Sequence, residues 1–435
     1  MALYVQKFGG TSVADAEKLR ASAQHAAGAC ARGHQVIVVV SAMGHATDEM
    51  LELIDTVKLP GGAVGHDKRE IDQLLATGEQ VAISMMALTL QSLGCPSASL
   101  TGEQAGIRVD QVHGRASITG VQGDRVQELL DKGAVPVVAG FQGINPAGDT
   151  ATLGRGGSDT TAVALAARFG GTCEIYKDVD GVFTADPRIV PDARLRTRVS
   201  YDEMLEAAAL GSQVIHPRAV ELARKFHVPI RVLHSQYGAG LSEGAGDERG
   251  TLIVLEDQAM ESRVVSSVVL KRGIGRVSIR GLVNRPGIQS DVFGPIATAH
   301  VPVDDIIQED DGPGTINLTF TLDKTDLPQA SAIVHKIGHT IGAQSIRIDA
   351  DLCTVSAIGD GMRTSPGVAS RMFKSLADEG ITVQNITTSE IRISCVVAEA
   401  DGERATRCVH SAFGLHAVEV PTTAHVVEGK TTVRA

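Results

Sequence analysis

The chain has 435 residues, 43% of them hydrophobic and 21% charged, which is enough for about two to four domains with buried cores. Its formal net charge is −11, it has no Trp, and only 3% of its residues are aromatic. Nucleic acids and anionic membranes attract basic patches, and single-stranded bases stack on aromatic rings, so we expect neither among its partners.

The first half alternates strand-like and helix-like patterns. Strands are predicted at residues 3–8 (LYVQKF), 35–41 (QVIVVVS), 135–141 (VPVVAGF), 173–183 (CEIYKDVDGVF) and 228–235 (VPIRVLHS). Helices are predicted at residues 14–33, 70–94 and 159–170, and we expect the second of these to divide into two pieces near Gly78. Strands that alternate with helices predict an α/β fold with a largely parallel sheet covered on both faces.

Residues 235–250 (SQYGAGLSEGAGDERG) interrupt this pattern. They contain five glycines and no apolar periodicity, which predicts a domain boundary. Beyond them lies an internal repeat, because residues 285–306 and residues 365–386 align without a gap at an offset of 80. Strand patterns flank both copies (RVSIRGL and TINLTFTL, then CTVSAIG and EIRISCVV). The repeat therefore predicts two small α+β modules.

A glycine turn follows the first predicted strand. KFGGTSV (residues 7–13) places Lys7, Gly9, Gly10 and Ser12 at one turn, although its spacing fits neither GxxxxGK[ST] nor GxGxxG. Free backbone N–H groups beside a lysine are typical of a phosphate site. A glycine hinge with a solvated lysine is the alternative.

Two further turns belong at the same edge of the sheet. SAMGHATDE (residues 41–49) offers Ser41 and Thr47, and TLGRGGSDTTAVALAA (residues 152–167) offers Arg155, Ser158 and Asp159. Open parallel sheets bind ligands at the carboxyl ends of their strands, so these turns predict a phosphoryl-transfer site. There Asp159 would hold Mg²⁺ or orient Lys7. We also expect Ser158 or Asp159 to cap the following helix.

The cysteines and the first residues indicate the cellular compartment in which the protein works. The six cysteines form no CxxC pair and no metal-ligand spacing, which is typical of free thiols in a reducing cytoplasm. No run approaches the roughly 20 apolar residues of a membrane span, and MALYVQKFGG is too short for the apolar core of a signal peptide. We expect a cytoplasmic protein.

The motifs together carry a resemblance that spans essentially the whole chain. KFGGTSV, VSAMGHATDE, LATGEQ, VVAGFQG, TLGRGGSDTTAVALAA, YKDVDGVFTADPR and VPIRVLHS, in that order, resemble the aspartate kinases of the amino acid kinase family. The repeated modules resemble the tandem ferredoxin-like ACT domains of these enzymes. The resemblance implies a catalytic domain at residues 1–236, a glycine-rich linker at 237–260, and ACT domains at 261–345 and 346–425, with strand exchange between the two ACT domains as an alternative.

The implied reaction is the phosphorylation of the β-carboxylate of L-aspartate by MgATP to give 4-phospho-L-aspartate. It is the first step toward lysine, threonine and methionine, and the ATP phosphates carry the Mg²⁺ in place of a protein metal site. By resemblance Lys7 and Asp159 are catalytic, and the substrate residues are Ser41, Thr47, Glu79, Arg155, Gly156 and Ser158. The phosphate and nucleotide residues are Lys7, Gly9, Gly10, Ser12, Lys177, Asp178, Asp180, Phe183, Asp186, Arg188 and Gln213.

Two positions in the nucleotide pocket depart from the family pattern. Gln213 stands where the family usually has the lysine of a GSK or GAK motif, and Lys177 stands where a small hydroxyl residue is common. An amide cannot neutralise phosphate charge, so we hypothesise that Lys177 supplies the lost charge from the other wall of the pocket. We interpret the nearby His216 as a helix cap or a packing residue.

The regulatory half implies effector binding at interfaces between ACT domains, with lysine and threonine as the usual inhibitors. The matching positions are Asn284, Ile288, Gln289, Asp304 and Gln308 in the first module and Ser365, Val383 and Asn385 in the second. Glu309 stands where the family commonly has asparagine, which leaves the ligand of the first site open. Strand pairing between modules predicts a homodimer or a larger homo-oligomer.

Two alternative functions stay open at this point. One is a kinase for another acidic acceptor, such as acetylglutamate or glutamate, which the tandem modules and ATGEQ disfavour. The other is a catalytically weak amino-acid sensor that binds lysine or threonine and responds by a change of oligomer. Gln213 and Glu309 favour the sensor, whereas Lys7, Arg155 and Asp159 favour the kinase.

Overall fold

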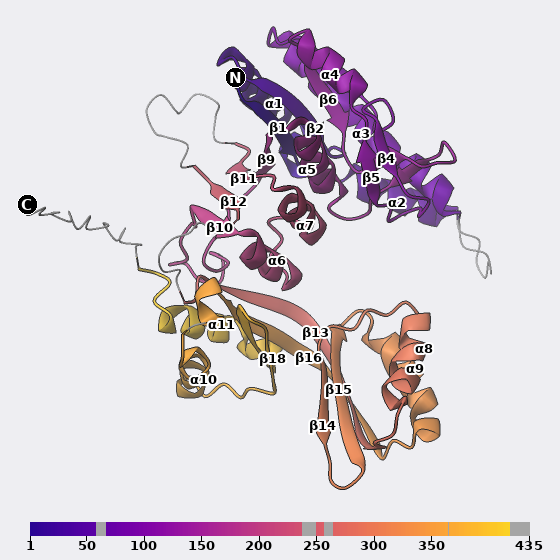
Figure 1. Cartoon of the computed structure of the whole chain (residues 1–435), viewed down its shortest axis with the longest axis vertical. Coiled ribbons are helices and arrows are strands. Elements are labelled where there is room, and N and C mark those ends of the chain that lie inside the picture. Colours follow the sequence, from indigo (N-terminus) through magenta and orange to yellow (C-terminus); the bar gives the residue numbers. More distant parts are fainter. Residues whose placement is uncertain (58–66, 237–248, 256–263, 364, 418–435) are drawn as a thin grey trace, which may run out of the picture.

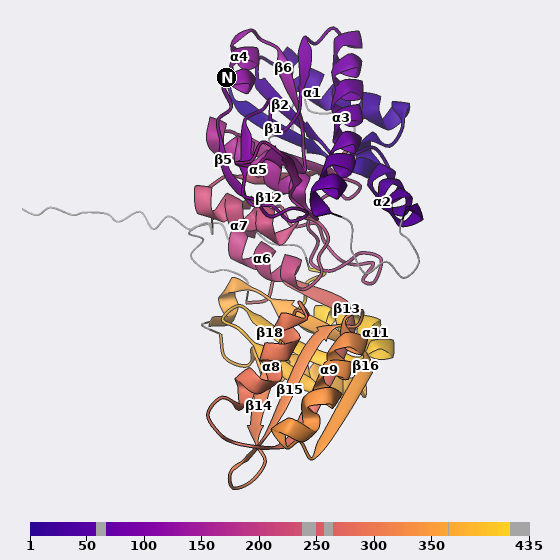
Figure 2. The same ribbon diagram turned by 90° about the vertical axis from the view of Figure 1, so that its right-hand side faces the viewer.

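A computed structural model describes residues 1–57, 67–236, 249–255, 264–363 and 365–417. Two parts lie end to end in it, and each is built on a sheet of its own (Figures 1 and 2). The first part occupies the top of Figure 2 and the second part, after residue 264, occupies the bottom. Within the described residues no helix combines the length and the apolar character needed to cross a membrane.

The first part contains an eight-stranded sheet in the order β10-β12-β11-β9-β1-β2-β6-β3. Its strands are β1 (Leu3–Phe8), β2 (Gln35–Val40), β3 (Ser97–Leu100), β6 (Val135–Ala139), β9 (Thr172–Lys177), β10 (Arg198–Ser200), β11 (Ile230–His234) and β12 (Thr251–Val254). Every neighbouring pair is parallel except β11 and β12. The predicted parallel sheet is therefore confirmed.

Helices cover both faces of this sheet. They are α1 (Ala16–Ala31), α2 (Ala46–Thr56), α3 (Lys68–Ser92), α4 (Asp124–Asp131), α5 (Gly157–Phe169), α6 (Tyr201–Ala209) and α7 (Pro217–Phe226). In β2, Val36, Val38 and Val40 join the core under α1 and α3. Ile37 and Val39 join the opposite core, under α4 to α7. Because side chains alternate along a strand, the continuous apolar run of β2 fills both cores.

Helix α3 is one continuous helix, so the predicted break near Gly78 is wrong. A Cβ at Gly78 would lie 2.7 Å from Cε of Met50 and 2.8 Å from Cβ of Ala42. The glycine therefore serves a close approach between α3 and the segment that follows β2, and this packing offsets the low helix propensity of glycine.

Two features of the first part were not predicted. A four-stranded sheet in the order β5-β4-β7-β8 consists of β4 (Ile107–Val109), β5 (Ile118–Val121), β7 (Gln142–Ile144) and β8 (Thr150–Thr152). Strands of three or four residues are too short to show a periodic pattern. The other feature is β12, which lies within the stretch predicted as linker but pairs with β10 and β11. The rest of that linker falls largely outside the described residues.

The second part is an antiparallel six-stranded sheet in the order β14-β15-β13-β16-β18-β17. Its strands are β13 (Ser267–Val283), β14 (Ile306–Asp310), β15 (Thr315–Asp323), β16 (Ser345–Ile358), β17 (Asn385–Thr388) and β18 (Arg392–Ala398), and its helices are α8 (Ile288–Thr298), α9 (Leu327–Ile341), α10 (Val368–Asp378) and α11 (Gly402–Ala412). The long strands β13 and β16 pair along their length, so the sheet continues from one module into the other.

The two modules show the predicted repeat. Helices α8 and α10 begin 80 residues apart, each directly after a glycine with positive φ, 89° at Gly287 and 87° at Gly367. Each helix packs on a core of its own, α8 with Ile288 and Val292 and α10 with Met372. The predicted repeat of β-turn-helix-β-β units is therefore confirmed.

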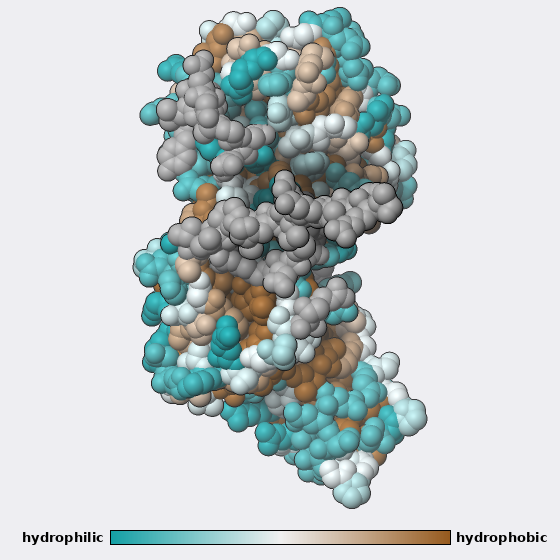
Figure 3. Space-filling model, turned by 60° about the vertical axis from the view of Figure 1, so that its left-hand side comes forward, coloured by the Kyte–Doolittle hydropathy of each residue, from teal (hydrophilic) through white to brown (hydrophobic). Residues whose placement is uncertain are grey.

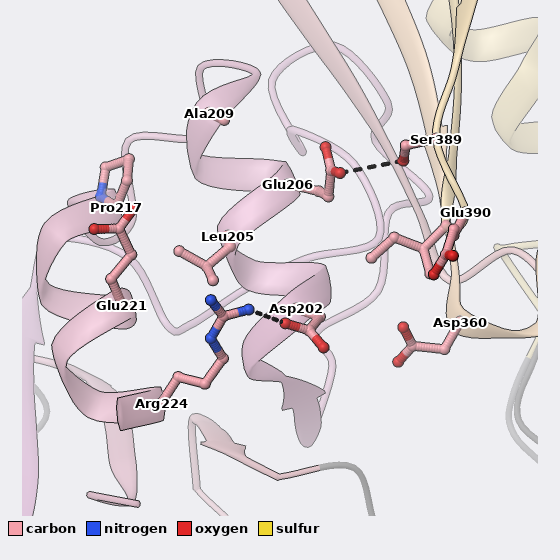
Figure 4. A pocket seen from close by; sticks show the side chains of 11 residues that line it. Asp202, Leu205, Glu206, Ala209, Pro217, Glu221, Arg224, Asp360, Ser389 and Glu390 are labelled. Atoms are coloured by element: carbon pink, nitrogen blue, oxygen red, sulfur yellow. Dashed lines mark hydrogen bonds and ion pairs between the residues drawn. The ribbon is translucent and has the colours of Figure 1, made fainter. Parts of the chain in front are cut away.

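One junction between the two parts lies between α6 and the turns that follow β16 and β17. Ser389 Oγ donates a hydrogen bond of 3.2 Å to Oε1 of Glu206, and Ser200 Oγ donates one of 2.9 Å to Oδ2 of Asp360. A cavity of about 570 Å³ lies between these elements and is lined by carboxylates and by Arg224 (Figure 4). On the face in Figure 3, apolar surface gathers below the junction and polar side chains cover much of both ends.

Candidate active site

The turns after β1 and β2 touch each other at the edge of the sheet. The turn after β1 continues into the short 3-10 helix η1 (Gly10–Val13). A Cβ at Gly10 would lie only 2.7 Å from the carbonyl oxygen of Ala42, so glycine is required for this close approach. The Ser41 N–H donates a hydrogen bond of 3.2 Å to the carbonyl of Phe8. The structure thus places Lys7, Gly9, Gly10 and Ser41 together, as predicted from the sequence.

A buried cluster of three charges lies beside these turns. Nζ of Lys7 is 2.7 Å from Oδ1 of Asp159, and Nζ of Lys177 is 3.7 Å from Oδ2 of the same carboxylate. Lys7 is 5% exposed and Asp159 is 3% exposed. Lys7 comes from β1, Lys177 from the end of β9, and Asp159 from the first turn of α5. The cluster carries one net positive charge, which suits a phosphate group.

The ionisation of the cluster follows from its contacts. Burial alone would raise the pKa of the Asp159 carboxyl, but the ammonium groups of Lys7 and Lys177 outweigh it and hold that pKa below its ordinary value. Burial and the positive charge of Lys7 lower the pKa of the Lys177 ammonium. The carboxylate of Asp159 is therefore ionised near neutral pH, and it orients the lysines on either side.

The N-terminus of α5 corrects one prediction. The N-cap is Gly156, with φ 71°, and no side chain caps the helix. Neither Ser158 nor Asp159 is the cap, because both lie inside the helix and the Asp159 carboxylate contacts the two lysines. The Gly157 N–H donates to the carbonyl of Gly154 at 3.0 Å, and the N-terminus of a helix favours an anion.

Two residues at the start of α7, His216 and Arg218, support the glycine loop between β8 and α5 (residues 153–156). A Cβ at Gly156 would lie 2.1 Å from Cγ of His216, so the imidazole packs directly against the loop. His216 is the N-cap of α7 and accepts a hydrogen bond from the Arg218 backbone N–H, which confirms its interpretation as a cap or packing residue. The Arg218 guanidinium donates to the carbonyls of Leu153 at 2.5 Å and Ala116 at 2.8 Å. Sequence reasoning missed Arg218, and its place directly after a histidine and a proline was the only signal.

Glu79 lies on the buried face of α3, against the turn that follows β2. It is 2% exposed, and its Oε1 accepts a hydrogen bond of 2.9 Å from the Ala42 backbone N–H. Its Oε2 is buried and has no hydrogen-bond partner among the described residues. Burial raises the pKa of the Glu79 carboxyl to about 7. A buried acceptor without a partner is unfavourable in the free protein and suits a ligand that brings a donor.

Replacing Glu79 with glutamine is expected to stabilise the ligand-free protein above neutral pH. The folded pKa of about 7 lies above the ordinary value of 4.5, so the stability associated with protonated Glu79 is lost as the pH rises through 7. At about pH 8 the gain for Glu79→Gln should be of the order of 3 kcal/mol, from 1.36 kcal/mol per pKa unit. Urea unfolding at about pH 8 and at about pH 4 measures it. An equal difference at both pH values would contradict the raised pKa.

The remaining predicted site residues differ in their surroundings. Arg155 is exposed on the glycine loop and forms no ion pair with any described residue. Thr47 lies in the first turn of α2, and Gln213 is exposed between α6 and α7. Asp178, Asp180 and Phe183 follow β9 in the chain. Asp186 and Arg188 bind one another at 2.7 Å, and neither is paired with the Lys7 cluster.

The predicted effector residues form local contacts in the first module. Nε2 of Gln289 donates to Oε1 of Gln308 at 2.8 Å, and Nζ of Lys271 lies 2.6 Å from Oδ2 of Asp304. Asn284 is exposed after β13, whereas the side chain of Ile288 is fully buried in the core. In the second module Ser365 and Val383 are half-buried, and Asn385 begins β17.

Comparison with known proteins identifies the family. Residues 2–234 match the model of the amino acid kinase family, and residues 355–413 match that of an ACT domain. The aspartokinase of Pseudomonas aeruginosa (strain PAO1) is 43% identical over 423 residues, which cover 96% of this chain and 98% of that protein. Aspartokinase 2 of Bacillus subtilis (strain 168) is 43% identical over 416 residues, with 95% and 98% covered. The chain belongs to the aspartate kinase family.

Solved structures of aspartate kinases agree with this assignment. The aspartate kinase of Synechocystis is 38% identical, with a TM-score of 0.51 over 97% of this chain and 70% of that chain. E. coli aspartokinase III in complex with aspartate and ADP has a TM-score of 0.76 over 94% of this chain and 99% of that one. At 22% identity this second likeness shows the fold alone. The predicted aspartate kinase family and its fold are thus confirmed.

Proposed function

We propose that this aspartate kinase transfers the γ-phosphoryl group of MgATP to the β-carboxylate of L-aspartate and yields 4-phospho-L-aspartate. The observation that carries the proposal is the buried Lys7–Asp159–Lys177 cluster between two glycine turns, at the N-terminus of α5. Phosphoryl transfer requires mainly positioning and neutralisation of charge, and this arrangement supplies both.

The roles in the transfer follow from the charges. Lys7 faces the phosphoryl group during its transfer, and the N–H groups of Gly9 and Gly10 lie beside it. Ser12 lies in the same turn. Asp159 fixes Lys7 and Lys177 at their distances of 2.7 and 3.7 Å. No group of three or more His, Cys, Asp or Glu among the described residues could hold a metal ion. In this proposal the Mg²⁺ is part of the substrate and travels on the ATP phosphates.

The acceptor side fits an amino acid with a second carboxylate. The unpaired Oε2 of Glu79 accepts a hydrogen bond from the substrate ammonium group. The guanidinium of Arg155 forms a bidentate pair with the substrate carboxylate that does not react, which a lysine could not do. Ser41, Thr47, Gly156 and Ser158 border this side of the site.

The nucleotide lies against the segment after β9. Its pocket consists of Lys177, Asp178, Asp180, Phe183, Asp186, Arg188 and Gln213. Lys177 is the member that reaches the catalytic cluster, with 22% of its side chain exposed. It therefore has solvent access for a phosphate oxygen while it pairs with Asp159.

Replacing Lys177 with alanine is expected to raise the KM for ATP about tenfold, because one of two cations near the phosphates is lost. Restoring a lysine at the other wall, in the double variant Lys177→Ala, Gln213→Lys, should recover much of this loss. Initial rates at varied ATP and saturating aspartate measure both effects. Lys225→Ala, an exposed lysine on α7, is the matched control. An unchanged KM for ATP in Lys177→Ala would refute the compensation.

Regulation is the second part of the proposal. Lysine, threonine or both bind the ACT modules at Asn284, Ile288, Gln289, Asp304, Gln308, Ser365, Val383 and Asn385 and inhibit the kinase. The chain acts as a homodimer or larger oligomer through these modules. Supporting this, the edge strands β14 and β17 expose Ile306 (53%) and Ile386 (44%), which are equivalent positions of the repeat.

ADP release from MgATP tests the proposal, with L-aspartate, L-glutamate and N-acetyl-L-glutamate as acceptors, each with and without lysine and threonine. Turnover that depends on aspartate and is suppressed by either effector supports both parts. Turnover with another acceptor would mean that the enzyme is a kinase for that acceptor and that aspartate is not its substrate. Effector binding without turnover on any acceptor would favour an amino-acid sensor.

A further inference from the structure

The second regulatory module reaches into the segment that joins β9 and β10. Nε2 of His410, on α11, lies 2.9 Å from Oγ1 of Thr184, which is 226 residues earlier in the chain. Both side chains are buried, with 2% of His410 and 5% of Thr184 exposed. Thr184 directly follows Phe183 and lies two residues before Asp186. The contact thus joins a regulatory helix to the proposed nucleotide wall.

Thr184 has every polar atom engaged. Its N–H donates to the carbonyl of Arg194 at 2.8 Å, and its carbonyl accepts from the N–H of Val268 at 2.8 Å. Its Oγ1 accepts a hydrogen bond of 2.9 Å from the Arg194 N–H. The hydroxyl hydrogen is therefore free to be donated to His410. Burial lowers the pKa of the His410 imidazole, so it is neutral near neutral pH and Nε2 can accept.

Two more contacts attach the same segment to the end of the regulatory half. Nη1 of Arg407, one turn before His410 on α11, donates to the carbonyl of Ile189 at 3.4 Å. The Arg194 guanidinium donates to the carbonyl of His416, just beyond the helix. Helix α11 thus contacts the segment at two places, and the residues just beyond it contact the segment at a third. The hydrogen bond from Ser389 to Glu206, at the other junction, joins the turn after β17 to α6 and includes no residue of the segment.

We infer that His410 is a positioning residue for the nucleotide, acting through Thr184 on Phe183 and Asp186. The ATP side of the kinase is then shaped directly by the second regulatory module, whereas Glu79 and Arg155 on the acceptor side have no contact of this kind among the described residues. A movement of α11 would alter ATP binding before it altered aspartate binding. The inference rests on the proposed function in one respect, that this segment binds ATP.

Replacing His410 with leucine in the full-length chain tests the inference. A buried hydroxyl without its partner costs enough to displace the segment, so the KM for ATP and the Kd for ADP should each rise about tenfold. The KM for aspartate should change by less than about twofold, since no acceptor residue is touched. His410→Gln, whose amide can accept the same hydrogen bond, should restore most of the ATP affinity. A purely structural role would weaken both substrates or lower the amount of folded protein.

Variants at Thr184 keep the test independent of the fold of α11. Thr184→Val removes the hydroxyl at nearly the same volume and should reproduce the effect of His410→Leu, whereas Thr184→Ser keeps the hydroxyl and should behave like the wild type. Ser389→Ala, at the other junction, is the control for loosening the two parts in general and should leave the KM for ATP unchanged. Unchanged ATP and ADP affinities in His410→Leu and Thr184→Val would overturn the inference.

The ADP titration by calorimetry separates the two proposals. A wild-type chain that binds ADP but phosphorylates no acceptor would refute the kinase proposal, and the His410 variants could still be compared by their Kd for ADP. A wild-type chain that binds no ADP would refute the inference as well, because the segment would then have no nucleotide to position.

Discussion

Replacing Lys7 with alanine is expected to lower kcat for ADP release dependent on aspartate by about 10³-fold, since it removes the preorganised charge that faces the transferring phosphoryl group. The ammonium lies 2.7 Å from Asp159 and is 5% exposed, so water cannot take its place without reorganisation. The KM for ATP should change far less than kcat, because the charge acts chiefly on the transition state. Single-turnover and steady-state rates separate these two quantities.

The matched control is Lys18→Ala, because Lys18 is a lysine of the same half of the chain with 38% of its side chain exposed. It should keep the wild-type kcat. Lys7→Arg should recover little, because a planar guanidinium does not fit the space of an ammonium packed against Gly9. A Lys7→Ala variant that is folded and within tenfold of the wild-type rate would remove Lys7 from the mechanism, where tenfold corresponds to about 1.4 kcal/mol.

The sequence predicted those features that depend on local pattern. The run QVIVVV contains apolar residues at every position after Gln35, and both faces of β2 are buried as such a run predicts. The glycines of KFGGTSV and TLGRGG indicated turns at strand ends, and parallel strands bring such turns to one edge. Lys7 and Asp159 could be expected to meet for this reason, and they do so at 2.7 Å.

The features that the sequence did not predict depend on contacts between distant segments. Gly78 looked like a helix breaker because its neighbours Met50 and Ala42 are far away in the sequence. Arg218 supports the glycine loop through hydrogen bonds to two carbonyls, and no sequence motif indicates these bonds. The bond between Thr184 and His410 joins residues that are 226 positions apart in the chain. In each case tertiary packing decided the role, and local propensity carried no information about it.

Lys177 shows how a departure from a family pattern acquires a physical meaning in the structure. From the sequence it was an unusual residue near the nucleotide pocket. In the structure it shares Asp159 with Lys7, so the same carboxylate balances two cations. Any change to Asp159 must therefore act on both lysines together, which gives the largest combined effect on activity and stability that the site offers.

Asp159→Asn is expected to lower kcat by about 10²- to 10³-fold and to destabilise the folded protein by about 3–5 kcal/mol, because the buried ammonium group of Lys7 and the partly exposed one of Lys177 lose their counter-charge. The contribution of Asp159 to the stability of the wild type depends on pH, and its direction follows from the pKa of Asp159. In the wild type the folded pKa of Asp159 lies below 3.8, so the stability it contributes is present above that pH and is lost as the pH falls below it. The variant should lack this acid transition. Urea unfolding from about pH 3 to pH 10 measures both features.

A second substitution separates the structural role of Asp159 from its catalytic role. In the double variant Asp159→Asn, Lys7→Met one of the two unbalanced charges is gone, so most of the lost stability should return while the activity stays absent. The destabilisation of Asp159→Asn alone should also shrink at alkaline pH, since burial and the charge of Lys7 already lower the pKa of the Lys177 ammonium and the variant lacks the carboxylate that opposes them. If the double variant is no more stable than Asp159→Asn alone, the two lysines are not held by Asp159, and the proposed balance of charges at this site is wrong.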